Sequence, residues 1–261
     1  MASFGLLLMV IGPIWSGQHP ATPSKTSSAD SEFPKANRLK RIIVFDVNET
    51  LLDLRALDPI FEQVFGDVAL RPMWFAQMLQ IAFVGTITGA YVDFTSAQHA
   101  ALSMIAARRG VELKDGDSDR IVGAMSHLPA YPEVNPALHR LIDAGFRLAA
   151  LTNSVPEVAE AQLINAGLHS SFEQVLSADE VRRLKPAPEP YRMAAQRFGT
   201  DPGGICLVAA HSWDISGALE AGCSAAFVAR PGMVLSPIGK QPEIVGRDIL
   251  EIAEQIIQRD P

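Results

Sequence analysis

The stretch Arg41–Leu54, RIIVFDVNETLLDL, decides the fold class of this chain. It opens with an apolar run rich in Ile, Val and Phe, which is typical of a strand buried on both faces of a parallel sheet. The run stops on an acid, Asp46, with Asn48 two residues later. Asp46 fits three roles, namely a nucleophile, a metal ligand or the cap of a following helix. The rest of the sequence must decide among them.

The chain after this stretch alternates between strand and helix patterns. Apolar runs predict further strands at 147–153, 174–178, 205–210 and 225–230, and helices at 133–145, 156–167, 189–199 and 216–222. Each helical pattern ends on Gly, a common stop signal. The alternation predicts an α/β fold, a Rossmann-like three-layer arrangement with helices on both faces of a parallel sheet. Ligands bind such sheets at the carboxyl ends of the strands.

One region breaks this alternation, because 57–128 carries helical patterns and no convincing strand. Its first pattern has five apolar residues at helical spacing: Leu57, Ile60, Phe61, Val64 and Phe65. We expect an all-helical cap at 55–129, inserted into a core formed by 41–54 and 130–261. A cap over the strand ends excludes water from chemistry there.

Composition limits the partners. A net charge of −7 and a pI near 5.4, without a basic run, give no reason to expect nucleic acid. The apolar run 4–15 is too short to span a bilayer, which takes about 20 residues. We expect no membrane partner and interpret residues 1–40 as a dispensable extension of a cytoplasmic protein, with a signal peptide and export as the alternative. We expect Cys206 and Cys223 to be buried free thiols.

Reactive side chains follow four of the predicted strands. Each taken alone has an ordinary explanation as a helix cap, a loop charge or a core residue. Together they form the inventory of an active site at one edge of the sheet. They are Asp46 with Thr50, Thr152 with Asn153, Lys185 with Tyr191, and the group His211, Trp213 and Asp214.

The order of these motifs resembles the haloacid dehalogenase superfamily, over about 41–230. FDVNETLLD, LTNS, LKPAPEPY and SWDISGA look like the type II 2-haloacid dehalogenases. The resemblance implies that Asp46 attacks the substrate and forms an ester, which water then hydrolyses. It further implies that Lys185 keeps Asp46 ionised and that Asp214 positions or activates the water. Thr50, Thr152 and Asn153 would hold the carboxylates of Asp46 and of the substrate.

Most members of this superfamily are magnesium-dependent phosphatases, which is the main alternative. Those enzymes carry a general acid where this chain has Asn48 and a metal ligand where it has Ala210. Both departures argue against phosphate chemistry, so we expect no metal and no cofactor. The predicted activity is hydrolysis of a small halogenated carboxylate, a 2-haloalkanoate. A catalytically silent binding protein is the third alternative.

The chain also departs from the type II pattern. Asn48 stands where an aromatic residue is usual, Ala209 and His211 stand where Ser and Asn are usual, and Phe75 replaces the arginine that receives the halide. The nearest arginine, Arg71, is about one helical turn away.

Neutral N–H donors remain for the halide. We place Trp74, Trp213 and His211 beside the substrate, together with Asn48, Tyr191 and Phe75. His211 fits a second base, a donor or polar filler, of which filler or orientation is favoured. The apolar cap helices fit either a buried core or a dimer contact, of which a core is favoured, although a homodimer would agree with the family.

Overall fold

The computed structural model describes residues 40–260, and the predictions for the N-terminal extension lie outside them. One sheet holds six parallel strands in the order β3-β2-β1-β4-β5-β6. The strands are β1 (Ile42–Phe45), β2 (Leu148–Thr152), β3 (Gln174–Ser177), β4 (Ile205–Ala209), β5 (Ser224–Val228) and β6 (Ile244–Gly246). The predicted α/β class is confirmed, and β6 is a strand that the sequence analysis did not identify.

Strand β1 lies at the centre of the sheet. Its residue Ile43 pairs with Leu148 of β2 on one side and with Cys206 of β4 on the other. All four residues of β1 are buried, as its apolar sequence predicts. From β1 the strand order runs outward in both directions, and at such a switch point the loops part and leave a crevice. Asp46 follows β1 immediately at this point.

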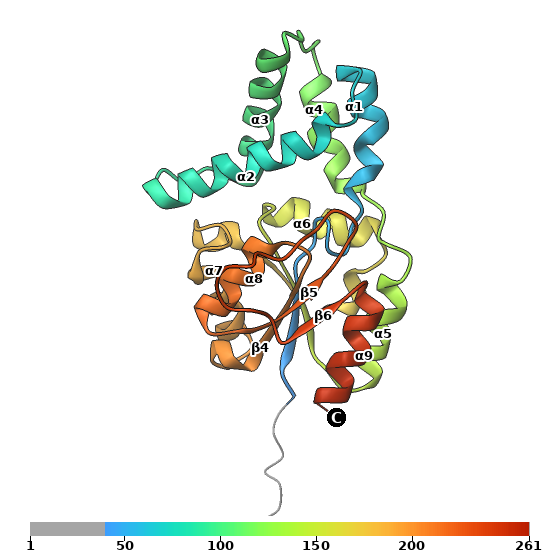
Figure 1. The fold of residues 1–261 in the computed structure, drawn as a ribbon, viewed down its shortest axis with the longest axis vertical. Helices are drawn as coiled ribbons and strands as arrows, with labels where there is room; N and C mark the ends of the chain where they lie inside the picture. The colour runs from blue at the N-terminus through green and yellow to red at the C-terminus, as the bar shows by residue number, and fades with distance from the viewer. Residues whose placement is uncertain (1–39, 261) are drawn as a thin grey trace, which may run out of the picture. The chain divides into compact units, whose positions relative to one another are not determined.

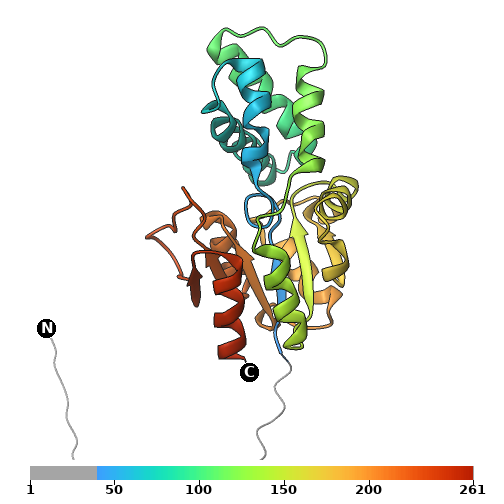
Figure 2. The ribbon, with the colours of Figure 1, turned by 90° about the vertical axis from the view of Figure 1, so that its right-hand side faces the viewer.

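Side chains of β1 alternate between the two faces of the sheet, as the period of a strand requires. Ile43 and Phe45 belong to the core cluster that includes α5 (Val134–Asp143), α6 (Pro156–Asn165) and α9 (Ile249–Arg259). Ile42 and Val44 belong to the cluster that includes α7 (Pro188–Arg197) and α8 (Ser212–Ala221). Figure 2 shows α5 and α9 side by side on one face.

Between β1 and β2 the chain forms helices and no strand. They are the 3-10 helix η1 (Leu54–Leu57), α1 (Asp58–Phe65), α2 (Leu70–Thr88), α3 (Phe94–Arg109), α4 (Asp117–Ala124), the short 3-10 helix η2 (Met125–His127) and α5, which packs on the sheet. Figure 1 shows α1–α4 gathered at one end of the sheet. α2 carries apolar residues around much of its surface because it packs within this group and also against the core.

Two chain segments join these helices to the sheet, and they run side by side. Asp53 N–H donates to the Pro129 carbonyl at 2.9 Å, and Tyr131 N–H donates to the Leu51 carbonyl at 3.0 Å. The helices also contact the core at their far side, where Arg183 Nη1 donates to the Thr86 carbonyl at 2.9 Å. The cap limits 55–129 stay a prediction.

Two further predictions concern single features. Cys206 and Cys223 are free and buried, as expected. Within residues 40–260, no helix combines the length and the apolar character needed to cross a bilayer.

Candidate active site

The carboxylate of Asp46 is buried and held from both sides. Its Oδ1 accepts from Lys185 Nζ at 3.0 Å, and its Oδ2 accepts from Thr50 Oγ1 at 2.7 Å and hydrogen bonds with His211 Nδ1 at 3.1 Å. Thr50 is fixed in turn by the Ala210 N–H, 2.9 Å away. Although burial raises the pKa of Asp46, the two cations and the hydroxyl lower it well below its ordinary value. Asp46 is therefore an anion of fixed orientation.

Lys185 is fully buried, and its ammonium group has no donor to spare. Nζ donates to Asp46 Oδ1, to Asp214 Oδ2 at 2.6 Å and to the Leu151 carbonyl at 2.8 Å. Burial lowers the pKa of Lys185, but the two carboxylates raise it above its ordinary value, so the side chain stays charged. Asn153 holds the backbone of this residue, because its Oδ1 accepts from Lys185 N–H at 2.8 Å and its Nδ2 donates to the Lys185 carbonyl at 3.1 Å.

Asp214 lies in the first turn of α8, and its side chain is completely buried. One oxygen accepts from Lys185, and the other accepts from Tyr191 Oη at 2.5 Å. The close approach depends on Gly217, where an added Cβ would lie 2.6 Å from Tyr191 Oη. Burial raises the pKa of Asp214, and Lys185 opposes that rise. Tyr191, expected beside the substrate, instead supports Asp214 from the interior.

His211 lies between two carboxylates. Its Nδ1 is 3.1 Å from Asp46 Oδ2, and its Nε2 is 3.0 Å from Glu49 Oε2. Burial alone lowers the pKa of His211, but the hydrogen bonds and charges of the two acids raise it to about 9. The ring is therefore an imidazolium at neutral pH, and both of its N–H groups are engaged. This differs from the expectation of a neutral donor open to a halide.

Glu49 was not predicted from the sequence. Its backbone has a φ of +60°, in the left-handed region that few residues other than glycine adopt. Backbone strain of this kind persists where the surroundings fix it, and it gathers at functional sites. Arg71 of α2 approaches Glu49 at 3.7 Å and bonds Asp58 at 2.5 Å. Arg71 thus reaches the edge of the site but is already paired with acids.

Asn48 belongs to a buried polar chain. Its Oδ1 accepts from Gln162 Nε2 at 2.8 Å, and its Nδ2 donates to Ser154 Oγ at 3.3 Å. Ser154 N–H donates to Thr152 Oγ1 at 3.1 Å, so the Thr152 side chain holds the backbone of this loop. Gln162 and Ser154 were not among the predicted site residues, although Ser154 is the last letter of the LTNS motif.

Two aromatic rings, one from the cap and one from α8 of the core, stack on His211. Phe75 of α2 stacks on the His211 ring with centroids 5.7 Å apart, and Trp213 stacks on the same ring at 5.0 Å. The Nε1 atom of Trp213 is buried and, among the residues that the structure describes, finds no acceptor. Trp74 was expected here as a donor, but its Nε1 donates to the Gln98 carbonyl at 3.0 Å within the cap. That expectation is wrong, since the Trp74 side chain faces the interior of the cap.

The residues present do not fit a magnesium ion, the cofactor of the phosphatase branch. Mg²⁺ requires a near-octahedral set of oxygen ligands. Both oxygens of Asp46 already accept hydrogen bonds, and the cationic ring of His211 fills the space between Asp46 and Glu49. Over residues 40–260, no group of three or more His, Cys, Asp or Glu side chains is arranged to hold a metal.

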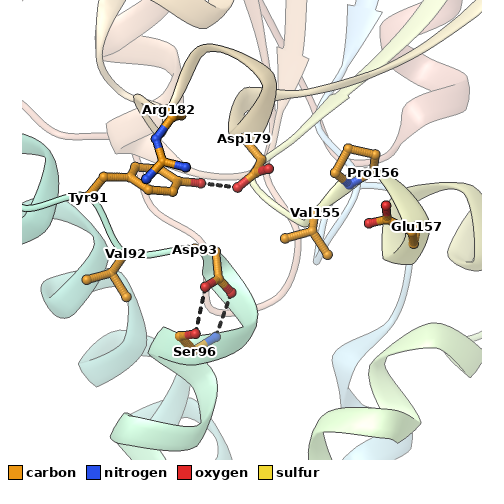
Figure 3. A pocket seen from close by; sticks show the side chains of 9 residues that line it. All are labelled: Tyr91, Val92, Asp93, Ser96, Val155, Pro156, Glu157, Asp179 and Arg182. Atoms are coloured by element: carbon orange, nitrogen blue, oxygen red, sulfur yellow. Dashed lines mark hydrogen bonds between the residues drawn. The ribbon is translucent and has the colours of Figure 1, made fainter.

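A pocket of about 680 Å³ opens nearby, where the cap meets the core. Figure 3 shows Tyr91 and Asp93 of the cap facing Asp179 and Arg182 of the core, with Val155 at its base. Tyr91 Oη donates to Asp179, and the Arg182 guanidinium lies 4.4 Å from the Tyr91 ring centroid. None of the predicted site residues lines this pocket, although Val155 in its lining directly follows Ser154 in the sequence.

Comparisons with known proteins identify the family to which this chain is similar. The model of the haloacid dehalogenase-like hydrolases matches residues 40–222. The (S)-2-haloacid dehalogenase 4A of Burkholderia cepacia is 31% identical over 194 residues, 74% of this chain and 84% of that protein. Haloacetate dehalogenase H-2 of a Moraxella species is 28% identical over 203 residues, covering 77% and 91%.

A solved structure of an L-2-haloacid dehalogenase superposes with a TM-score of 0.80 at 28% identity, covering 83% of this chain and 98% of that one. The six-stranded parallel sheet with its helices is an α/β fold that matches these haloacid dehalogenase structures. The family match spans well over half of the chain. The chain therefore belongs to the haloacid dehalogenase-like hydrolase family.

Proposed function

We propose that this hydrolase releases halide from small 2-haloalkanoic acids, with Asp46 as the nucleophile and without a metal ion. The observation that carries the proposal is the Asp46 carboxylate, kept ionised by Lys185 at 3.0 Å while an imidazolium stands where a cation would bind. The names of the two curated relatives, a 2-haloacid and a haloacetate dehalogenase, support the substrate class.

In the first half-reaction, Asp46 attacks the carbon that bears the halogen. Oδ1 is the less committed oxygen, because it has one donor, Lys185, whereas Oδ2 has two. The new C–O bond forms as the carbon–halogen bond breaks, and the halide leaves with the bonding electrons. The free Trp213 N–H is the donor available to receive it. Attack opposite to the leaving group inverts the configuration of the carbon.

In the second half-reaction, water attacks Cγ of the Asp46 ester. Asp214 is poorly placed to activate this water, since it is fully buried and both of its oxygens are bonded to Lys185 and Tyr191. His211 is better placed, because it contacts Asp46 on the side away from Lys185. We assign the base role to His211, with Glu49 orienting its ring.

Ester formation prepares His211 for this role. Once Asp46 is esterified, one of the two anions that raise the pKa of His211 is gone, so the ring releases its proton to solvent. Neutral His211 then accepts a proton from water as the oxygen bonds to Cγ. It passes this proton to the departing alkoxide and takes back the proton of the new carboxyl group. Asp46 is again an anion and His211 again a cation, and the net products are the hydroxy acid, the halide and one proton.

Halide release tests the function. Wild type and Asp46→Asn should be incubated with both enantiomers of 2-chloropropionate, with bromoacetate and with fluoroacetate, each with and without EDTA. We expect release by wild type from at least one acid, unchanged by EDTA, and none by Asp46→Asn. Loss of release in EDTA, or a p-nitrophenyl phosphatase activity that rises with Mg²⁺, would favour the phosphatase. No release from any acid would favour a silent binding protein.

A burst experiment tests the base. His211→Gln keeps a polar side chain of comparable length but has no basic nitrogen to accept a proton, and it avoids Asn, the usual residue at this position in type II enzymes. We expect it to release about one halide per active site and then stall, with the ester visible on Asp46 by intact-mass measurement. Asp214→Asn is the comparison, because the assignment predicts slower ester formation there and no accumulated ester. Normal turnover by His211→Gln would refute the assignment while leaving the dehalogenase proposal intact.

A further inference from the structure

We infer that Gln162 is a positioning residue for substrate recognition: it fixes the direction of the Asn48 amide, so that Asn48 and Ser154 present hydrogen-bond donors to the substrate carboxylate. The identity of the substrate rests on the proposed function. The orientation of the amide rests on the contacts of Gln162 alone.

The direction of the Gln162 amide is set by a backbone group. Its Nε2 donates to the Met125 carbonyl at 2.9 Å and to Asn48 Oδ1 at 2.8 Å. A carbonyl oxygen can only accept, so the NH₂ group of Gln162 must face Met125. The opposite orientation would set two oxygens against each other in a completely buried place. Gln162 Oε1 has no partner, so no contact favours that opposite orientation.

The direction of Gln162 then determines that of Asn48. Since Gln162 presents its NH₂ group, Asn48 must present its oxygen to Gln162 and its own NH₂ group to Ser154. Ser154 Oγ accepts from Asn48, which leaves its hydroxyl proton for another acceptor. The second N–H of Asn48 is likewise uncommitted among the contacts of the described residues. The fixed chain of hydrogen bonds thus ends in two donors, one on Ser154 and one on Asn48, which follows Asp46 by two residues.

The two buried donors, the Asn48 N–H and the Ser154 O–H, favour a ligand that offers hydrogen-bond acceptors. Asn48 and Ser154 are 4% and 2% exposed, and a buried donor without an acceptor is unfavourable. A carboxylate satisfies both because it accepts only, whereas a neutral amide offers one oxygen and one NH₂ group. The chain of contacts therefore predicts preference for an acid over its amide.

Binding of an unreactive acid tests this preference. Propionate and propionamide should be titrated into wild type, Gln162→Glu and Gln162→Leu by calorimetry. Neither new side chain can donate to both Met125 and Asn48, so the Asn48 amide loses its fixed direction. We expect propionate to bind roughly tenfold to 100-fold more weakly, as for loss of a hydrogen bond to a charged group, and propionamide to be affected much less.

Asn165→Asp is the matched control. It makes the same amide-to-acid change on the same helix, where Asn165 Nδ2 donates to the Ser126 carbonyl at 2.8 Å, and it does not touch Asn48. We expect its ratio of propionate to propionamide affinity to match wild type. With 2-chloropropionate, Gln162→Glu should raise KM and leave kcat nearly unchanged, since the carboxylate is bound alike in the ground and transition states.

A double-mutant cycle separates positioning from general damage. In an Asn48→Ala background, Gln162→Glu should cause no further loss of propionate binding. The inference is overturned if that loss persists, if acid and amide weaken equally, or if wild type shows no preference for propionate. These outcomes do not depend on dehalogenation. A wild type that binds propionate but releases no halide refutes the proposed function, and the affinity ratios still decide the role of Gln162.

Discussion

Replacing His211 by Asn should change how the stability of the protein depends on pH. The imidazole is buried and paired with Asp46 and Glu49, and its pKa rises from 6.5 to about 9 on folding. One pKa unit corresponds to about 1.4 kcal/mol, so the charged ring contributes at most about 3 kcal/mol to the free energy of unfolding. Asn is uncharged at every pH and lacks this contribution.

The sign follows from the raised pKa. The stabilisation is fully present below pH 6.5, where the ring is protonated in both states. It declines as the pH rises, because only the folded protein then keeps the proton, and it is lost above about 9. A protein of this size loses roughly 2–4 °C of Tm per kcal/mol. The stability gained from the charged ring thus corresponds to about 6–12 °C.

Urea unfolding of wild type and His211→Asn, measured at intervals from acidic to alkaline pH, checks this expectation. The difference in unfolding free energy between the two proteins is the relevant quantity, because other titrating groups are common to both. We expect this difference to shrink by up to about 3 kcal/mol between pH 6.5 and about 9. A difference that stays constant over that range would show that the folded protein holds a neutral ring.

Four other substitutions, at three positions, give distinct outcomes. Gly217→Ala places a Cβ 2.6 Å from Tyr191 Oη and should cost about 1–3 kcal/mol in urea unfolding, and an unchanged midpoint would contradict the tight packing. Tyr191→Phe removes the 2.5 Å bond to Asp214 and should cost about 1.5–3 kcal/mol by thermal unfolding, with Tyr191→Trp worse because of its size. Phe75→Arg sets a cation against the His211 ring and should lower the pKa of that ring by NMR titration, whereas an unchanged value would argue that the new side chain turns away.

The core of the fold could be predicted because its signals are local. The run before Asp46 is buried over its whole length, and period-two alternation divides it between the two faces of the sheet. β6 was not predicted because its three residues, Ile244–Gly246, are too few to show the alternation of apolar and polar residues that distinguishes a strand from a loop. The next helix, α9, does show apolar residues at helical spacing, and its amphipathic sequence was a signal that could have been used.

The site could be predicted only in part. Motif order identifies Asp46 and Lys185, whose contacts in the structure fit the expected charge pairing. Glu49 was missed because its place depends on a left-handed backbone that nothing in the neighbouring letters requires. Gln162 was missed because its partner, Asn48, lies 114 residues away in the sequence. The direction of Trp74 depends on how α2 is rotated, which cap packing decides.

The two antiparallel connections between the helical insertion and the sheet lie close to the residues that orient Asn48. Met125, whose carbonyl orients Gln162, belongs to the short helix just before the second connection. A rotation of the cap about these connections would carry that carbonyl away and release the Asn48 amide from its fixed direction. The N–H and O–H groups that bind an acid would then be correctly oriented only while the cap is packed against the core. Closing the cap over the site and orienting the donors that bind the substrate carboxylate would then occur in one step.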